Sequence, residues 1–199
     1  MKMNRDNRVY KTYVQILKEE LVPAMGCTEP IAIAYAAAKA RDLLGRHPEK
    51  VEIEVSNNII KNVKSVILPN TGGLKGIEAA AAAGIVAGRA EKQLEVVAEV
   101  TDKQKEEMGE FLNSVPICVS ALDGDIIFEI IVTLYAGKEY TKVRISQYHT
   151  NIDLVEKNGE ILFSAETDHD SEKINSDHTE ETGLPDKALL NLEDIIDFA

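Results

Sequence analysis

The segment from Pro23 to Pro30 places a cysteine, Cys27, at the predicted start of a helix. The hydroxyl of Thr28 can cap the first turn, and Glu29 suits a first-turn position because the positive end of the helix dipole stabilises a carboxylate there. A thiolate is favoured at the same position, and it is the form of cysteine that acts as a nucleophile or a metal ligand. The alternative interpretation is that Cys27 is a small hydrophobic residue of the core.

A second segment that could do chemistry is the turn formed by Asn70, Thr71, Gly72 and Gly73, which precedes a predicted helix. Free backbone N–H groups in such a turn can point at one centre and bind a carboxylate or a phosphate. The turn matches neither the phosphate-binding loop of nucleotide-binding proteins nor the dinucleotide fingerprint, so nucleotide binding is disfavoured. A tight turn without any ligand is the simpler alternative.

The remaining candidates for chemistry are Cys118 and the four histidines, of which His149, His169 and His178 could act as ligands or bases but are expected to be solvated. Cys118 lies between two apolar residues of a predicted strand, so we expect it in the core. His47 and His149 are expected to be exposed to solvent. His169 and His178 lie in an acidic stretch, where their spacing matches no standard metal site.

Helices and strands must position these groups, and the periodicity of apolar residues predicts both. Four helices are expected from helical spacing and end signals, over residues 10–21, 28–44, 77–89 and 101–112. The second and third are rich in alanine, and the fourth begins with a capping box formed by Thr101 and Gln104.

Alternating or β-branched stretches predict strands over residues 51–55, 59–67, 94–100, 117–122, 126–134 and 140–146, with a hairpin in 151–163 around Asn158 and Gly159. The predicted fold class is therefore α+β, with alanine-rich helices packed against a mainly antiparallel sheet.

Three regions are predicted along the chain. Residues 1–165 form the α+β region, and residues 166–185 are an acidic, flexible linker because they contain few apolar side chains. Residues 186–199 begin a helix without a terminating signal, which predicts that this helix continues into a carboxyl-terminal domain absent from the sequence.

Bulk composition narrows the function and the location. With 34 acidic and 22 basic residues, the formal net charge of −12 argues against a nucleic-acid partner. Two cysteines form neither a disulfide framework nor a paired zinc pattern, which favours a reducing cytoplasm. The amino-terminal segment lacks a secretory signal, and the apolar runs are too short to span a membrane.

The segments Leu21 to Ala40 and Leu68 to Gly84 resemble the L-cysteine desulfidase family, which is related to the alpha region of iron-sulfur L-serine dehydratases. The phrase Pro-Ala-Met-Gly-Cys-Thr-Glu-Pro-Ile-Ala is the specific element. The loop Pro69 to Gly76 and the alanine-rich helix after it resemble the second glycine loop of the family. All 199 residues look collinear with the amino-terminal half of such proteins.

The resemblance implies a [4Fe-4S] enzyme that converts L-cysteine to pyruvate, ammonia and hydrogen sulfide. Cys27 would be a cluster ligand, and Asn70, Thr71, Gly72 and Gly73 would hold the carboxylate of the small amino-acid substrate. An iron left open by three cysteine ligands would act as a Lewis acid on the leaving group.

The sequence departs from this family because the other cluster cysteines belong to the half that follows, and Cys118 lies in no corresponding motif. The cluster is therefore expected only together with the missing carboxyl-terminal half, and the chain alone should be catalytically incomplete. The expected partners are a second chain that supplies that half and a further copy in a homo-oligomer. The alternatives are an iron-sulfur L-serine dehydratase and a non-catalytic module for anion binding or protein interaction.

Overall fold

The computed structural model describes residues 4–124, 126–165 and 187–199. The predicted acidic linker, with His169 and His178, lies outside these residues. Contacts divide the chain into a larger unit, residues 24–173, and a smaller unit, residues 1–23 and 174–199. None of the described helices is long and apolar enough to cross a membrane.

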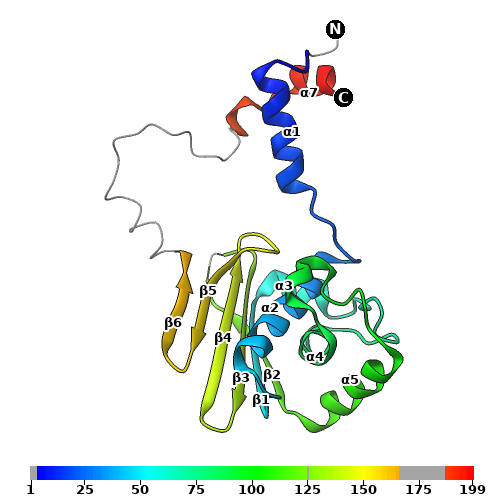
Figure 1. Cartoon of the computed structure of the whole chain (residues 1–199), viewed down its shortest axis with the longest axis vertical. Coiled ribbons are helices and arrows are strands. Elements are labelled where there is room, and N and C mark those ends of the chain that lie inside the picture. Colours follow the sequence, from blue (N-terminus) through cyan, green and yellow to red (C-terminus); the bar gives the residue numbers. More distant parts are fainter. Residues whose placement is uncertain (1–3, 125, 166–186) are drawn as a thin grey trace. The chain divides into compact units, whose positions relative to one another are not determined.

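The larger unit contains one six-stranded sheet in the order β2-β1-β3-β4-β5-β6, with helices on one of its faces (Figure 1). The strands are β1 (Lys50–Ser56), β2 (Ile117–Leu122), β3 (Glu129–Ala136), β4 (Glu139–Ser146), β5 (Ile152–Lys157) and β6 (Glu160–Ser164). Only β1 and β2 pair in parallel, and every other pair is antiparallel. This confirms the predicted α+β fold with a mainly antiparallel sheet.

The alternation of apolar and acidic residues along β1 explains how the sheet packs against the helices. Val51, Ile53 and Val55 are fully buried against the helical layer, whereas Glu52 and Glu54 lie on the other face. Successive side chains of a strand point to opposite faces, so one apolar face and one polar face follow directly from the sequence.

The helical layer consists of α2 (Thr28–Leu44), α3 (Asn57–Val63), α4 (Ile77–Ala87), the 3₁₀ segment η1 (Ala90–Glu95) and α5 (Asp102–Ser114). The alanines of α2 and α4 are buried, and this lets the two helices approach closely. The predicted capping box of α5 is confirmed, because the side chains of Thr101 and Gln104 each accept a hydrogen bond from the other's backbone N–H.

The two alanine-rich helices run in the same direction. A Cβ atom at Gly84 would lie 2.1 Å from the carbonyl oxygen of Ala34, and one at Gly88 would lie 2.8 Å from the Cβ of Ala38. From the first contact to the second, the position advances by four residues in both segments, which requires that the two helices run parallel. The guanidinium of Arg41 donates to the carbonyl oxygens of Ile85 and Gly88 and so satisfies the carboxyl-terminal end of α4.

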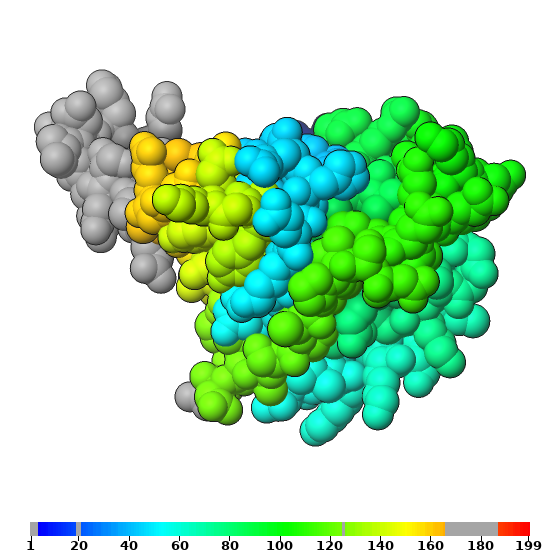
Figure 2. Space-filling model, turned by 90° about the horizontal axis from the view of Figure 1, so that it is seen from below, coloured from blue at the N-terminus to red at the C-terminus, as the bar shows by residue number. Residues whose placement is uncertain are grey.

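Figure 2 shows the end of the larger unit at which β1 begins, with the residues before β1 in blue to cyan beside the yellow-green β3–β4 turn. Glu49 ties the two together, because its backbone N–H donates to the carbonyl oxygen of Tyr135 and its carboxylate accepts from the N–H of Gly137. Arg46 approaches Glu139 across the same boundary.

Two predicted strands are wrong. Residues 59–67 were predicted to form a strand, but residues 59–63 belong to helix α3. The helix buries Ile59 and Val63, which are four residues apart and share one helix face. Residues 94–100 form the end of η1 and turns. The turn at residues 123–124 joins no hairpin, since β2 pairs with β1 and β3 pairs with the other edge of β1.

The smaller unit consists of α1 (Arg8–Glu20), the 3₁₀ turn η3 (Lys187–Leu189) and α7 (Leu192–Phe198). The hydroxyl of buried Tyr13 donates to the carbonyl oxygen of Leu189 and accepts from the N–H of Asn191. The ring of Phe198 packs on Tyr10 and Tyr13, with centroids 5.0 and 5.4 Å away. The predicted terminal helix is thus confirmed, but it starts later, after the capping residue Asn191.

Candidate functional site

Helix α2 begins at Thr28 as predicted, but its N-cap lies one residue before the predicted cap. Cys27 is the N-cap, with an extended backbone and no capping hydrogen bond from its side chain, and Thr28 is the first helical residue. The thiol of Cys27 is exposed, so the interpretation of Cys27 as a core residue is wrong. The preceding residue, Gly26, has a φ of 76°, which a glycine adopts without strain.

The two segments that the sequence singled out lie against each other. A Cβ atom at Gly26 would be 3.5 Å from the ring carbons of Pro69, and the side-chain amide of Asn70 donates to the sulfur of Met25 at 3.3 Å. The backbone N–H of Met25 in turn donates to the carbonyl oxygen of Leu94. We call these two segments, residues 25–29 and 69–76, the helix-start site, because they precede or open the parallel helices α2 and α4.

The side chains of Asn70 and Thr71 hold the shape of the loop. Asn70 donates to the carbonyl oxygens of Val97 and Ala98 at 3.1 Å each, and the hydroxyl of buried Thr71 donates to the carbonyl oxygen of Leu68 at 2.9 Å. Asn70 has a φ of 58°, a left-handed conformation that asparagine tolerates better than most residues.

The backbone N–H groups of this loop are its chemically available donors. Within the described part of the chain, the turn at residues 69–72 leaves the N–H groups of Thr71, Gly72 and Gly73 without a hydrogen bond of normal length and angle, and both glycines are exposed. Both also have positive φ angles, 74° and 97°. Thr71 is not among the residues with positive φ, so the backbone changes hand between Thr71 and Gly72, and such a change directs successive N–H groups into one concave surface that favours an anion.

A cation lies beside the loop. The Cδ atom of Lys105 on α5 is 3.9 Å from the position of a Cβ at Gly72. The ammonium group of Lys105 also pairs with Asp102 at 2.7 Å, and this hydrogen bond and charge lower the pKa of the Asp102 carboxyl. Sequence inspection missed Lys105, because nothing in the local pattern of α5 indicates that it faces the loop.

On the α2 side of the site, Glu29 accepts a hydrogen bond from the side-chain amide of Asn62 at 3.0 Å. His149 also interacts with Glu29. Burial lowers the pKa of His149, and the negative charge of Glu29 partly opposes that shift. The ring of His149 packs on Phe128 at 4.4 Å, and the residue is half-buried, so the prediction that His149 is solvated is wrong. Asn62 was not singled out from the sequence, and His149 was named there without any link to Glu29.

The open face of the sheet carries a second group of titratable side chains. Glu52 accepts hydrogen bonds from Lys50 and from the hydroxyl of Tyr135, both at 2.6 Å. These bonds lower the pKa of Glu52, and the bond to Glu52 together with burial raises the pKa of Tyr135 to about 12. Every member already has its partner, so this group is a structural network.

Cys118 lies on that same open face, opposite Glu52 in the neighbouring strand, and its thiol is exposed. The prediction that Cys118 belongs to the core is therefore wrong. Its neighbours Ile117 and Val119 pack against the core, and residues between them in a strand must point the other way.

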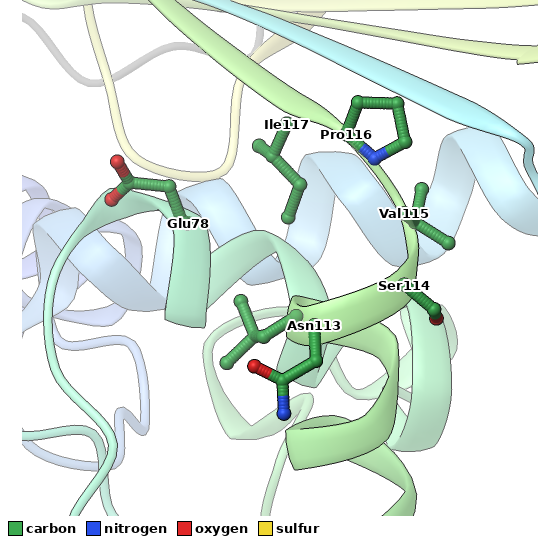
Figure 3. Close-up of a pocket in the computed structure, with 7 residues that line it drawn as sticks. Glu78, Asn113, Ser114, Val115, Pro116 and Ile117 are labelled. Atoms are coloured by element: carbon green, nitrogen blue, oxygen red, sulfur yellow. The ribbon is translucent and has the colours of Figure 1, made fainter.

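A pocket of about 430 Å³ lies between the first turn of α4 and the link from α5 to β2 (Figure 3). Glu78 is its only ionisable lining residue, and the rest of the lining comes from residues 112–117. In the described part of the chain, no three His, Cys, Asp or Glu residues gather in a way that could hold a metal ion. Cys27 thus belongs to no such group among these residues.

Curated relatives match nearly the whole chain. A UPF0597 protein of Desulfitobacterium hafniense (strain Y51) is 55% identical over 199 residues, which are 100% of this chain and 44% of the relative. UPF0597 proteins of Treponema denticola and Lachnoclostridium phytofermentans are 44% and 42% identical over 99% and 96% of this chain, and 44% and 43% of their own lengths. The chain therefore spans less than half the length of the curated relatives it matches.

No family model matches the sequence. No solved structure matches it either.

These relatives correct the predicted identity. Their names are those of UPF0597 proteins, not of L-cysteine desulfidases or iron-sulfur L-serine dehydratases, and they name neither a lyase nor an iron-sulfur protein. The identification as an iron-sulfur L-cysteine desulfidase is therefore wrong, and so is its L-serine dehydratase alternative. Its basis was two short segments, and a cysteine before a helix or a glycine turn is a local solution that unrelated proteins share.

Proposed function

We propose that the helix-start site binds a small carboxylate-bearing ligand, of which a small amino acid is the expected class. The chain would then act as an anion-binding module, the non-catalytic alternative among the functions considered. The observation that carries the proposal is the contact of Gly26 with Pro69 at the common end of two parallel helices.

Parallel packing supports anion binding because it brings two positive helix ends to the same side of the molecule. Two contacts fix the register of the helices: Gly84 lies against Ala34 and Gly88 lies against Ala38, a step of four residues on each side. Each helix end carries roughly half a positive charge and several N–H groups without a helical partner.

The groups around this end have complementary roles for a carboxylate. The N–H groups of Gly72 and Gly73 can donate to its oxygens, and Lys105 adds a positive charge beside them. Backbone donors and a lysine together bind oxyanions more strongly than either does alone.

On the α2 side of the site, a carboxylate can bind an amino group of the same ligand. Glu29 supplies a carboxylate, and its position is held by the hydrogen bond from Asn62. A ligand that carries both a carboxylate and an ammonium group therefore matches the signs of charge on the two sides. The exposed thiol of Cys27 lies two residues before Glu29 and is available for contact. The two free thiols also favour the cytoplasm as the location in this proposal.

The test is a titration of the isotope-labelled full chain followed by the amide resonances of Thr71, Gly72 and Gly73. L-alanine and propionate should shift these resonances, whereas L-alaninamide, which lacks the carboxylate, should not. Lys105→Gln should weaken the binding of propionate several-fold, because it removes the positive charge whose side chain lies beside Gly72.

Lys103→Gln is the matched control, since Lys103 lies on the same helix and its side chain is 83% exposed. Unchanged resonances in a large millimolar excess of L-alanine and propionate would overturn the proposal. Equal shifts with L-alaninamide would also contradict it.

A further inference from the structure

The smaller unit exposes several large apolar side chains. It consists of a helix of 13 residues and one of 7, and both leave large apolar side chains in solvent. Leu21, Leu192 and Ile196 are 70%, 73% and 67% exposed. Contiguous apolar patches on small helical units are typical of interaction surfaces.

Helix α1 carries a groove that borders its own contact with α7, because the lining residue Tyr10 packs on Phe198. The groove has a volume of about 390 Å³ and is lined by Arg5, Tyr10, Lys11, Val14, Gln15 and Lys18. Three of the six residues are cations and two are apolar. The floor is thus partly apolar and the rim is basic.

Helix α7 presents the opposite sign of charge. Leu192 and Ile196 are four residues apart, and so are Glu193 and Asp197, so each pair forms a stripe along the helix. All four residues are exposed within the unit. The surface is apolar with an acidic border, which is the complement of the groove on α1.

We propose that two copies of this chain associate through their smaller units, with α7 of each copy in the α1 groove of the other. A two-fold axis makes both contacts at once, because each copy offers one groove and one helix. The arrangement places four helices together, and helices of that number bury apolar stripes that a pair leaves exposed.

The opposite charges of the α1 groove and of α7 indicate that a second copy of this chain occupies the groove. The chain has a net charge of −12, so association of two copies is opposed by their overall repulsion. A contact between copies therefore needs local attraction, and the basic groove and the acidic stripe supply it twice per pair. Such contacts set the choice of partner and weaken with added salt.

This inference does not depend on the ligand at the helix-start site. Its test is the molar mass of the full-length chain in solution, by sedimentation equilibrium at low and high salt. The wild type should form a dimer that weakens at high salt.

A charge exchange makes the test specific. Lys11→Glu combined with Lys18→Glu should give monomers, because an acidic groove repels the acidic α7. Glu193→Lys combined with Asp197→Lys should also give monomers, because a basic α7 repels the basic groove. An equimolar mixture of the two variants should form a heterodimer, since both of its contacts again join opposite charges.

Restored association in the mixture also shows that both variants are folded. Lys138→Glu, an exposed lysine in the β3–β4 turn, is the matched control and should leave the dimer unchanged. A monomeric wild type would overturn the proposal, and it would mean that another surface covers α7. Variants that remain dimeric, or a mixture that stays monomeric, would overturn it as well.

Discussion

Gly84 of α4 lies so close to Ala34 of α2 that a Cβ atom added to it would stand 2.1 Å from the carbonyl oxygen of Ala34. Only a glycine fits at this distance. The contact sets the direction and the offset of the two helices, and through them it brings Cys27 and the loop 69–76 to one end of the larger unit.

Gly84→Ala should therefore destabilise the fold. The new methyl group must push α2 and α4 apart, and overpacking of this kind costs about 1–3 kcal/mol or more of the free energy of unfolding. Urea unfolding of the full chain measures the loss. Because the displacement moves both helix starts, binding of propionate at the loop should weaken too.

Gly109→Ala is the control for this substitution. Gly109 lies inside α5, and no heavy atom lies within 4 Å of an added Cβ. Alanine is a better helix former than glycine, so this variant should gain about 0.5–1 kcal/mol. A Gly84→Ala chain as stable as the wild type would disprove the close approach of the two helices.

Asn70→Ala should loosen the loop of the helix-start site. The substitution removes the donors to the carbonyl oxygens of Val97 and Ala98 and places an alanine at a φ of 58°. Two net hydrogen bonds and the left-handed strain together predict a loss of about 2–3 kcal/mol. Amide hydrogen exchange at Gly72 and Gly73 should become faster.

Asn158→Ala provides the comparison. Asn158 lies in the β5–β6 turn with a φ of 52°, and its side chain accepts a hydrogen bond from the N–H of Tyr140 on β4. That variant should lose stability without any change in exchange at Gly72 and Gly73. Equal acceleration at the loop in both variants would contradict the assigned role of Asn70.

The sequence singled out the two segments of the helix-start site, but it did not predict that they contact each other. Cys27 and the turn at Asn70 each showed a local signal, namely a helix start and a pair of glycines. Their contact depends on the parallel packing of α2 and α4, and no local pattern shows which alanines face each other. The interaction of His149 with Glu29 was missed for a related reason, because only the fold brings the two residues together.

Errors in the secondary structure have a physical cause as well. The β-branched residues Ile59, Ile60 and Val63 favour a strand locally, but Ile59 and Val63 lie on one helix face and are both buried. Tertiary burial decided the outcome. For Cys118, period-two alternation was a sufficient signal: partly buried neighbours on both sides, which pack against the core, place its thiol on the open face.

Tyr135 should make the stability of the protein depend on alkaline pH. Its pKa is raised from about 10 to about 12, chiefly by the hydrogen bond to Glu52. A raised pKa contributes stability that is fully present below pH 10 and is lost as the pH rises toward 12. Tyr135→Phe should flatten this part of the stability profile, as measured by urea unfolding at several pH values.

Tyr148→Phe is the matched control, because Tyr148 is 59% exposed and lies outside this network. Its profile should follow that of the wild type between pH 10 and 12. A Tyr135→Phe profile as steep as the wild-type profile would show that the hydrogen bond to Glu52 does not control the titration.

Both thiols should react with a solution thiol reagent while the chain is folded. Cys27 and Cys118 are exposed, so two equivalents should be modified in the absence of denaturant. Cys118→Ser and Cys27→Ser should each reduce the count to one. If the ligand sits at the helix-start site, saturating propionate should slow the modification of Cys27 and leave that of Cys118 unchanged. Equal rates with and without propionate in the Cys118→Ser chain would place the ligand away from Cys27, and a slowed Cys118 would point to a change in the sheet.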